Sequence, residues 1–228
     1  MRYCIADYRA LVFDCDGVVL NSNSVKTKAF YQATLPYGES AAKAMVEYHV
    51  ANGGVSRYKK FAHFLENIAP ACTALHGCHT LEVLLEAYAS YVREGLLTCD
   101  IAPGLEILRQ KTCDARWFIV SGGDQAELRD VFAQRGIASW FDGGIFGSPD
   151  TKDEILQREL VAKEIQLPAL FLGDSKYDFQ AATAAGLDFV FLSGWSEVAD
   201  WERWVEAYKL ACVACIDDMV RSAALENN

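Results

Sequence analysis

The fold is decided by the stretch Leu11-Val12-Phe13-Asp14-Cys15-Asp16-Gly17-Val18. Its first three residues form an apolar run that predicts a short buried strand, and two carboxylates and a glycine follow directly. Residues two apart in an extended chain project to the same side, so Asp14 and Asp16 can face one pocket. Two carboxylates at a strand end suit a hard cation, or a nucleophile beside an acid/base group. The alternative for these residues alone is a solvated turn.

Working outward, further short apolar runs alternate with helical patterns along the chain. This alternation is typical of a parallel sheet with crossover helices, so we expect an α/β fold with a Rossmann-like three-layer core around a central parallel sheet. The further strands are expected at 117–120, 144–146, 169–172 and 189–192, with a last edge strand at 212–216. The helices between them are expected at 124–135, 152–165 and 178–185.

One interval of the chain, from about 24 to 94, contains helical patterns and no convincing strand. Its helices are expected at 25–34, 40–48, 57–67 and 81–93. Gly, Asn, Ser and Pro interrupt the periodicity at 17–23 and 95–103, which predicts hinges there. We therefore expect a helical cap domain with its hinges at 18–99, inserted into a core domain made of 1–17 and 100–228.

Composition limits the partners of the protein. The 228 residues are 52% hydrophobic, and 31 acidic against 21 basic side chains give a net charge of −10. This charge disfavours nucleic acid and anionic membranes unless the basic residues gather on one face, and the sequence shows no such cluster. Arg2, Asp7 and Arg9 precede any sustained apolar run, so we expect no secretory signal and a cytoplasmic location. The eight cysteines are then expected to be reduced thiols.

Polar residues also follow the later strands, and the ligands of an open α/β sheet bind beyond the carboxyl ends of its strands. Ser121 and Gly122 offer a hydroxyl and an unhindered amide before a helix, which can hold an anionic oxygen. Lys152 opens a helix, a position unfavourable to a cation unless it faces an anion. Asp174 ends a strand, where it could cap the next helix, and Asp178 follows one helical turn later. Taken singly, these residues also fit ordinary turns, a solvated lysine and a helix cap.

Taken together and in this order, the four motifs resemble those of the haloacid dehalogenase superfamily. Its motifs are Asp-x-Asp-Gly after the first strand, Ser or Thr after the second, a Lys opening a later helix, and Gly-Asp…Asp after the fourth. The resemblance covers nearly the whole chain, and the helical insertion is similar to the cap of that family. It implies a Mg²⁺-dependent phosphoryl transfer at a site between core and cap, on a small-molecule phosphate ester that we expect to be a sugar phosphate.

The resemblance also implies roles for the first motif. Asp14 would be the nucleophile that attacks phosphorus and forms an aspartyl-phosphate. Asp16 would protonate the leaving alkoxide and then activate water. Since the hydrolytic dehalogenases of the superfamily lack this second Asp and need no metal, its presence favours a phosphatase.

The other motifs would hold the phosphoryl group and the metal. Carried over from the family, the phosphoryl oxygens would be bound by Ser121, the Gly122 amide and Lys152. The metal would be held by Asp14, the Asp16 carbonyl and Asp174, with Asp178 orienting metal-bound water or Lys152. Mg²⁺ and Lys152 would offset the repulsion between a carboxylate nucleophile and a phosphate dianion.

The subfamily is indicated by a second stretch, Gly54-Val55-Ser56-Arg57. It is similar to the Gly-Val-Ser-Arg of the sugar phosphomutases, in which the Arg contacts the distal phosphate, so Arg57, with Lys59 or Lys60 nearby, is a candidate substrate contact; a solvated basic turn is the alternative. Lys26 stands where those mutases have a His, and Ser22 and Lys26 are expected at the entrance. Hydrolysis is therefore expected over isomerisation, with a sugar phosphomutase and a catalytically silent binding module of the same fold as the alternatives.

Two cysteine patterns are not expected to carry chemistry. One comprises Cys72, His76, Cys78 and His79, whose spacing matches no standard zinc finger. The other is Cys212-x-x-Cys215, which lacks the helix start of a redox motif and would place its thiols on opposite faces of a strand. Cys15 is expected to point away from the pocket into the core.

Overall fold

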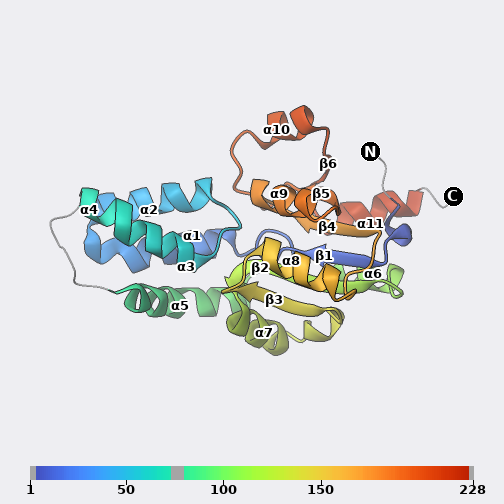
Figure 1. The fold of residues 1–228 in the computed structure, drawn as a ribbon, viewed down its shortest axis with the longest axis horizontal. Helices are drawn as coiled ribbons and strands as arrows, with labels where there is room; N and C mark the ends of the chain where they lie inside the picture. Colours follow the sequence, from blue (N-terminus) through green and yellow to red (C-terminus); the bar gives the residue numbers. More distant parts are fainter. Residues whose placement is uncertain (1–3, 73–79, 226–228) are drawn as a thin grey trace.

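A computed structural model describes residues 4–72 and 80–225 of the chain. The sheet in this part of the chain is parallel throughout, in the order β3-β2-β1-β4-β5-β6 (Figure 1). Its strands are β1 Ala10–Phe13, β2 Arg116–Asp124, β3 Gly144–Ser148, β4 Ala169–Gly173, β5 Asp188–Leu192 and β6 Ala211–Val213. Since β1 lies between β2 and β4, the residues that leave β1 emerge at the centre of the sheet.

Helices cover both faces of the sheet, because alternate residues of the buried strands enter two different apolar cores. Ala10 and Val12 of β1 belong to a cluster with side chains of the helices α8 and α9. Leu11 and Phe13 belong to a cluster with side chains of α6, α7 and α11. The core helices are α6 Leu105–Lys111, α7 Gln125–Gln134, α8 Lys152–Val161, α9 Lys176–Ala184, α10 Trp201–Tyr208 and α11 Ile216–Leu225. The chain therefore has the predicted three-layer α/β core.

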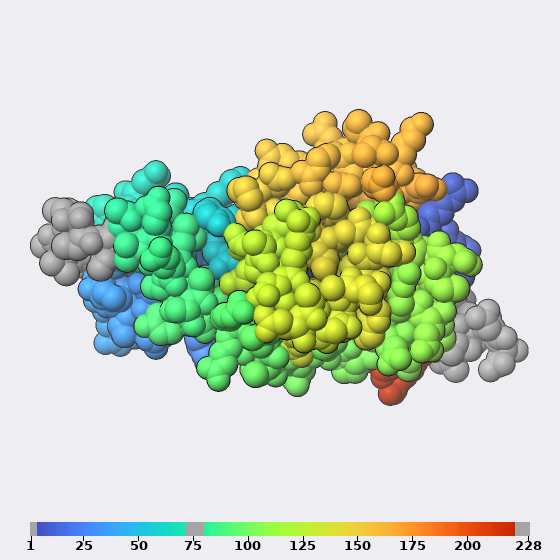
Figure 2. Space-filling model, turned by 90° about the horizontal axis from the view of Figure 1, so that it is seen from below, coloured from blue at the N-terminus to red at the C-terminus, as the bar shows by residue number. Residues whose placement is uncertain are grey.

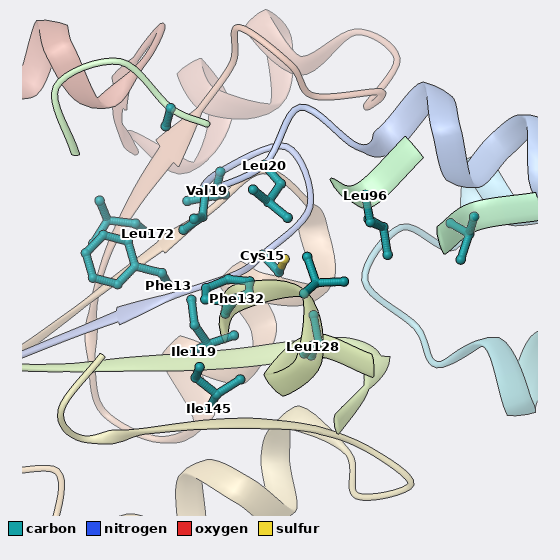
Figure 3. Close-up of a cluster of buried hydrophobic side chains, with 14 of the residues drawn as sticks. Phe13, Cys15, Val19, Leu20, Leu96, Ile119, Leu128, Phe132, Ile145 and Leu172 are labelled. Carbon is teal, nitrogen blue, oxygen red and sulfur yellow. The ribbon is translucent and has the colours of Figure 1, made fainter. Parts of the chain in front are cut away.

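The second cluster extends under the loop that follows β1, as Figure 3 shows. Cys15 is fully buried there beside Leu20, Leu128 and Phe132. Its thiol therefore points into the apolar core, as the sequence predicted, while the carboxylates on either side of it are free to face the opposite way.

The interval between β1 and α6 is helical, as predicted, and lies to the left of the sheet in Figure 1. Its helices are α1 Asn23–Thr34, α2 Glu39–Ala51, α3 Arg57–His63, α4 Ala69–Cys72 and α5 Leu81–Thr98, with a π-helix at Phe64–Ile68. Short 3₁₀ helices occur at Ile5–Asp7, Leu35–Tyr37 and Ala138–Trp140. The cap is held together by contacts among the rings of Phe30, Phe61 and Tyr88. Seen from below, cap and core pack directly against each other (Figure 2), and the division of the domains at 18 and 99 stays a prediction.

Two expected strands end at positions that differ from the structure by more than two residues. β2 was expected to stop before Ser121, but it continues to Asp124, because pairing with β3 resumes at Asp124–Ser148 after a shift of register. The last edge strand stops at Val213, and Ile216 begins α11, whose apolar face is buried in the core. The prediction that Cys215 lies in a strand was therefore wrong.

The cysteines of the described chain form no disulfide. Those described are free: Cys4, Cys15, Cys99, Cys113, Cys212 and Cys215. The possible zinc pattern around Cys72 lies outside the described residues, apart from the backbone of Cys72 itself. Across residues 4–72 and 80–225, no helix is both long enough and apolar enough to cross a membrane.

Candidate active site

The four predicted motifs meet at the carboxyl edge of the sheet. Asp14 leaves β1, Ser121 lies near the end of β2, Asp174 leaves β4, and Lys152 is the first residue of α8. All four side chains are buried, Ser121 completely. Parallel strands bring their carboxyl ends to one edge, which is why residues more than 100 positions apart in sequence come together here.

Lys152 is placed by the start of α8. Thr151 caps this helix, and Glu154 completes the capping box by accepting hydrogen bonds from Thr151. From this position the Lys152 ammonium lies 3.0 Å from Asp14 Oδ1 and forms an ion pair with Asp178. Burial alone would lower the pKa of Lys152, but these two carboxylates raise it above its usual value, so the lysine is charged.

Asp178 is placed by the start of α9, and here one prediction needs correction. Ser175, not Asp174, caps the helix, since its hydroxyl accepts a hydrogen bond from the Asp178 amide. In return, the amide and hydroxyl of Ser175 donate to Asp178 Oδ2 at 3.0 and 2.7 Å. Lys152 occupies Oδ1. Both oxygens of this fully buried carboxylate are therefore engaged, and Asp178 positions Lys152.

Asp14 has one engaged and one free oxygen. Its Oδ1 accepts hydrogen bonds from Lys152 and, at 2.7 Å, from the backbone amide of Cys15. No described residue donates a hydrogen bond to Oδ2. Burial raises the pKa of Asp14 to about 7, with Lys152 acting against the shift and Asp178 and Asp16 adding to it. The carboxylate is thus destabilised in a way that a further positive charge would relieve.

Asp174 lies beside Asp14 and is held by the cap. Asn23, at the start of α1, donates to Asp174 Oδ2 at 2.7 Å. Burial, and then the charges of Asp14 and Asp178, raise the pKa of Asp174 well above its usual value. A Cβ at Gly17, which has φ +72°, would lie only 2.0 Å from Asp174 Oδ2, so this position of the first motif requires glycine.

The carboxylate cluster fits a hard divalent cation. Asp14, Asp174 and Asp178 each present an oxygen within 4.8 Å of the others, and all three are buried. Among these three carboxylates, Lys152 supplies one positive charge, so the cluster is under-compensated. Carboxylate oxygens are ligands that Mg²⁺ prefers. Because both oxygens of Asp178 are engaged, Asp14 and Asp174 are the carboxylates with an oxygen to offer.

Asp16 is held separately, by the first turn of the cap. Ser22 donates to its Oδ1 at 2.6 Å, and Lys26 pairs with its Oδ2 at 2.5 Å. Burial raises the pKa of Asp16, but Lys26 and Ser22 lower it by more, so the pKa is below its usual value. Ser22 is fully buried and Lys26 is 7% exposed. The expectation that these two residues line an entrance was wrong for that reason: they hold a motif carboxylate inside the site.

The second motif lies where the cap packs tightly against the core. Ser121 Oγ accepts a hydrogen bond from the Gly123 amide at 3.0 Å, and Gly122 lines the cavity above Asp14. A Cβ at Gly122 would lie 2.3 Å from the carbonyl oxygen of Gly54 in the cap. Glycine is therefore required here so that the cap can rest on the core.

Three polar contacts join the cap to the core next to this point. Arg57 forms an ion pair with Glu127, and it is 6% exposed, so the alternative of a solvated basic turn was wrong. The Tyr58 hydroxyl donates to Asp124 Oδ2 at 2.8 Å, while Oδ1 of the same carboxylate caps α7. The Ser148 hydroxyl donates to Ser56 Oγ at 2.7 Å.

The cavity between cap and core has a volume of about 60 Å³. This is several times the roughly 10–15 Å³ that one water molecule needs. Its core side carries Asp14, Asp16 and Asp174. The lining also includes residues that the sequence did not single out: Asn23, Phe30, His49 and Tyr88 of the cap, and Glu197 of the loop after β5. The sequence also did not single out Ser175, although the Ser-x-x-Asp spacing to Asp178 is a local pattern that predicts a capping box.

The comparisons agree with this architecture. The family model described as haloacid dehalogenase-like hydrolase matches residues 8–186. A search of curated proteins gave no significant match. A predicted phosphoglycolate phosphatase from Haemophilus somnus superposes with a TM-score of 0.73 at 17% identity, covering 94% of this chain and 97% of the other.

Two further solved structures have the same fold. A predicted phosphatase from Clostridium acetobutylicum gives a TM-score of 0.71 at 16% identity, covering 96% of this chain and 99% of the other. The β-phosphoglucomutase of Clostridium difficile gives 0.66 at 16% identity, covering 96% and 98%. At identities this low, the superpositions show only the shared fold, and the family is shown by the match to the family model. With its carboxylates, lysine and helical cap in the described arrangement, the chain belongs to the haloacid dehalogenase-like hydrolases.

Proposed function

We propose that the protein is a Mg²⁺-dependent phosphatase that hydrolyses a small phosphomonoester through an aspartyl-phosphate on Asp14. The observation that carries this proposal is the state of the Asp14 carboxylate. Lys152 and the Cys15 amide fix Oδ1, while Oδ2 receives no hydrogen bond from the described residues and the side chain lines the cavity. An oriented carboxylate with one uncommitted oxygen is suited to nucleophilic attack.

In the first step, Asp14 attacks phosphorus, the bond between phosphorus and the ester oxygen breaks, and the carboxyl group of Asp16 gives its proton to the leaving alkoxide. In the second step, water attacks phosphorus of the aspartyl-phosphate, and Asp16 takes a proton from that water. The bond between phosphorus and the Asp14 oxygen breaks, which releases phosphate and regenerates the Asp14 carboxylate. Lys26 and Ser22 lower the pKa of Asp16, which favours the ionised form that the second step requires.

The remaining motif residues support the transferring group. Lys152, the Gly122 amide and the Ser121 hydroxyl bind its oxygens, and Asp178 keeps Lys152 in place. Asp14 and Asp174 would hold Mg²⁺, together with the Asp16 carbonyl. When bound, the ion supplies positive charge that offsets the repulsion between carboxylate and phosphate.

A sugar phosphomutase is the second candidate, because Arg57 of the Gly-Val-Ser-Arg stretch lines the cavity. Two observations favour hydrolysis. The Arg57 guanidinium is already paired with Glu127, and Lys26, where the mutases have a His, is paired with Asp16. Phosphorus NMR of a reaction with a sugar phosphate separates the two, since a mutase forms an isomer and a phosphatase releases inorganic phosphate.

The decisive experiment replaces Asp14 with Asn. We expect Mg²⁺-dependent release of phosphate from p-nitrophenyl phosphate to be abolished, because the amide cannot form the acyl phosphate. In the wild type, acid quenching during turnover should leave the peptide containing Asp14 heavier by one phosphoryl group. Mg²⁺ should raise the Tm of the wild type and have a smaller effect on the variant, which has lost a ligand.

The matched control is Asp114→Asn, which changes an exposed aspartate of the core. It should keep full activity and the full response of Tm to Mg²⁺. Phosphate release by Asp14→Asn at the wild-type rate would show that Asp14 is not the nucleophile.

A further inference from the structure

A second polar cluster lies in the same cavity, on its cap side. Lys60 of α3 and His49 of α2 both line the cavity, and they are 2% and 8% exposed. The Lys60 ammonium donates to His49 Nδ1 at 2.7 Å and to the His49 carbonyl oxygen at 3.3 Å. An ammonium has three hydrogens, so one remains for a ligand.

The charge of Lys60 is not compensated by the protein. The two other cationic side chains of the cavity each have a carboxylate partner: Lys26 has Asp16, and Arg57 has Glu127. Within the described chain, no carboxylate lies within ion-pair distance of Lys60. Burial, with a contribution from the charge of Lys26, lowers the pKa of Lys60 to about 7. Buried lysines are usually paired with a carboxylate. Lys60 therefore lacks the anionic partner that its burial would require.

His49 adds an unused donor. Because Lys60 donates to Nδ1, the neutral imidazole carries its hydrogen on Nε2. Burial, and then the charge of Lys60, lower the pKa of His49 to about 2, so the ring is neutral. Across the described residues, His49 Nε2 is the single fully buried side-chain nitrogen or oxygen that has no hydrogen-bond partner. A buried donor without an acceptor is costly, and a ligand atom in the cavity would satisfy it.

The remaining carboxylate of the cavity, from the loop after β5, already has a hydrogen-bond partner. Glu197 also lines the cavity, but its two oxygens accept hydrogen bonds from the Thr27 hydroxyl at 3.1 and 3.2 Å. Glu197 thus accepts from Thr27, and the ammonium of Lys60 and the Nε2–H of His49 each keep a hydrogen for an acceptor from outside the protein.

We propose that Lys60 and His49 bind a second anionic group, a carboxylate or a phosphate, carried by the leaving group of the phosphomonoester. This inference rests on the proposed function, because it places the scissile phosphate at Asp14 and the second anion at the other side of the cavity. It also differs from the expectation for Arg57: the guanidinium whose charge Glu127 already compensates is less suited to this task than the uncompensated ammonium.

The experiment compares matched pairs of esters that differ only in the second charge. The pairs are 2-phosphoglycolate with ethyl phosphate, and 1,3-propanediol bisphosphate with 3-hydroxypropyl phosphate, so that one pair tests a carboxylate and the other a phosphate. We expect kcat/KM of the wild type to be higher for the member that carries the second anionic group in at least one pair. In Lys60→Met this preference should fall roughly 30-fold or more, as expected when one partner of a buried charge pair is removed. With the member that lacks the second anionic group, kcat/KM should fall less.

Two variants serve as controls. Lys60→Arg keeps the charge and should keep part of the preference, and Lys28→Gln, an exposed lysine of α1, should keep all of it. Equal rates for both members of each pair in the wild type, or an unchanged preference in Lys60→Met, would overturn the subsite.

A binding measurement keeps this test independent of hydrolysis. Phosphonoacetate and ethylphosphonate differ by the same carboxylate and are not hydrolysed. Calorimetry should show tighter binding of phosphonoacetate to the wild type, and no such difference for Lys60→Met. 1,3-Propanediylbisphosphonate and propylphosphonate make the same comparison for a second phosphate. If no ester is hydrolysed, the phosphatase proposal fails, while calorimetry still decides whether the subsite exists; equal binding within both pairs of phosphonates would reject it.

Discussion

Asp16 shows how a single ion pair can set the protonation state of a motif residue. Its carboxylate is buried, which favours the protonated form, yet Lys26 and Ser22 shift the balance to the ionised form. The acid half of the proposed mechanism needs the proton and the base half needs its absence. Lys26 therefore determines in which pH range Asp16 can serve both halves.

Lys26→Met should shift the pH dependence of the enzyme. Without the ammonium, burial remains and the pKa of Asp16 rises, because the opposite charge no longer favours the ionised form. Activity that requires ionised Asp16 is lost as pH falls through its pKa, so the acidic limb of the kcat profile should move to higher pH by about one to three units. The profile of Lys28→Met should match the wild type, and an unchanged limb in Lys26→Met would separate Asp16 from the titration.

At the scale of elements, α8 and α9 begin with the same capping geometry, but the two caps have different roles. Thr151 and Ser175 each cap a helix in a capping box. The partner of Thr151 is the exposed Glu154, whereas the partner of Ser175 is Asp178, which holds Lys152. The two helix ends therefore allow stability to be separated from catalysis.

Thr151→Ala and Ser175→Ala should both lower the free energy of unfolding by about 1 kcal/mol, the usual contribution of a helix cap. Ser175→Ala should also lower kcat with p-nitrophenyl phosphate, because Asp178 loses the hydroxyl that orients it and Lys152 is less well placed. Thr151→Ala should leave kcat close to the wild type. Urea unfolding and steady-state kinetics on both variants check this, and equal kcat values would mean that Ser175 acts only as a cap.

The elements also show how far the sequence alone could lead. The strands and the motif carboxylates were predictable because apolar runs, turn residues and their spacing are local patterns. The positions of Asn23 and His49 in the site were not, since each lies on a helix of ordinary composition and reaches the cavity only through the packing of the cap on the core. Lys60 was named only as a neighbour of Arg57, and its place beside His49 also depends on that packing. The length of β2 was missed for a related reason: its last pair depends on Ser148 of a neighbouring strand.

On the scale of the whole molecule, cap and core meet with little clearance. The backbone of Gly122 lies directly under the carbonyl oxygen of Gly54, and the ion pair of Arg57 with Glu127 lies beside it. The site is complete only in this arrangement, because the cap supplies Asn23 to Asp174 and Lys26 to Asp16. Activity should therefore depend on how closely the two parts can approach.

Gly122→Ala should prevent this approach. The added Cβ would lie 2.3 Å from a backbone oxygen that cannot move by rotating a side chain. We expect kcat/KM to fall by about 100-fold, the effect of displacing catalytic groups by about 1 Å. Hydrogen exchange should be faster in α3 and unchanged in the sheet. Gly53→Ala is the matched control, because its Cβ would meet Ser175 at 3.4 Å and the Val50 carbonyl oxygen at 4.0 Å, both ordinary contacts; similar losses in both variants would exclude the proposed clash.

The carboxylate of Asp124 contacts both a core helix and the cap. One oxygen accepts the Glu127 amide and caps α7, and the other accepts the hydroxyl of Tyr58 from the cap. If the proposed reaction requires the cap to lift for exchange of substrate and product, only the second of these two bonds would have to break, and α7 would keep its cap. Movement of the cap would then leave in place the segment that follows Ser121 and Gly122.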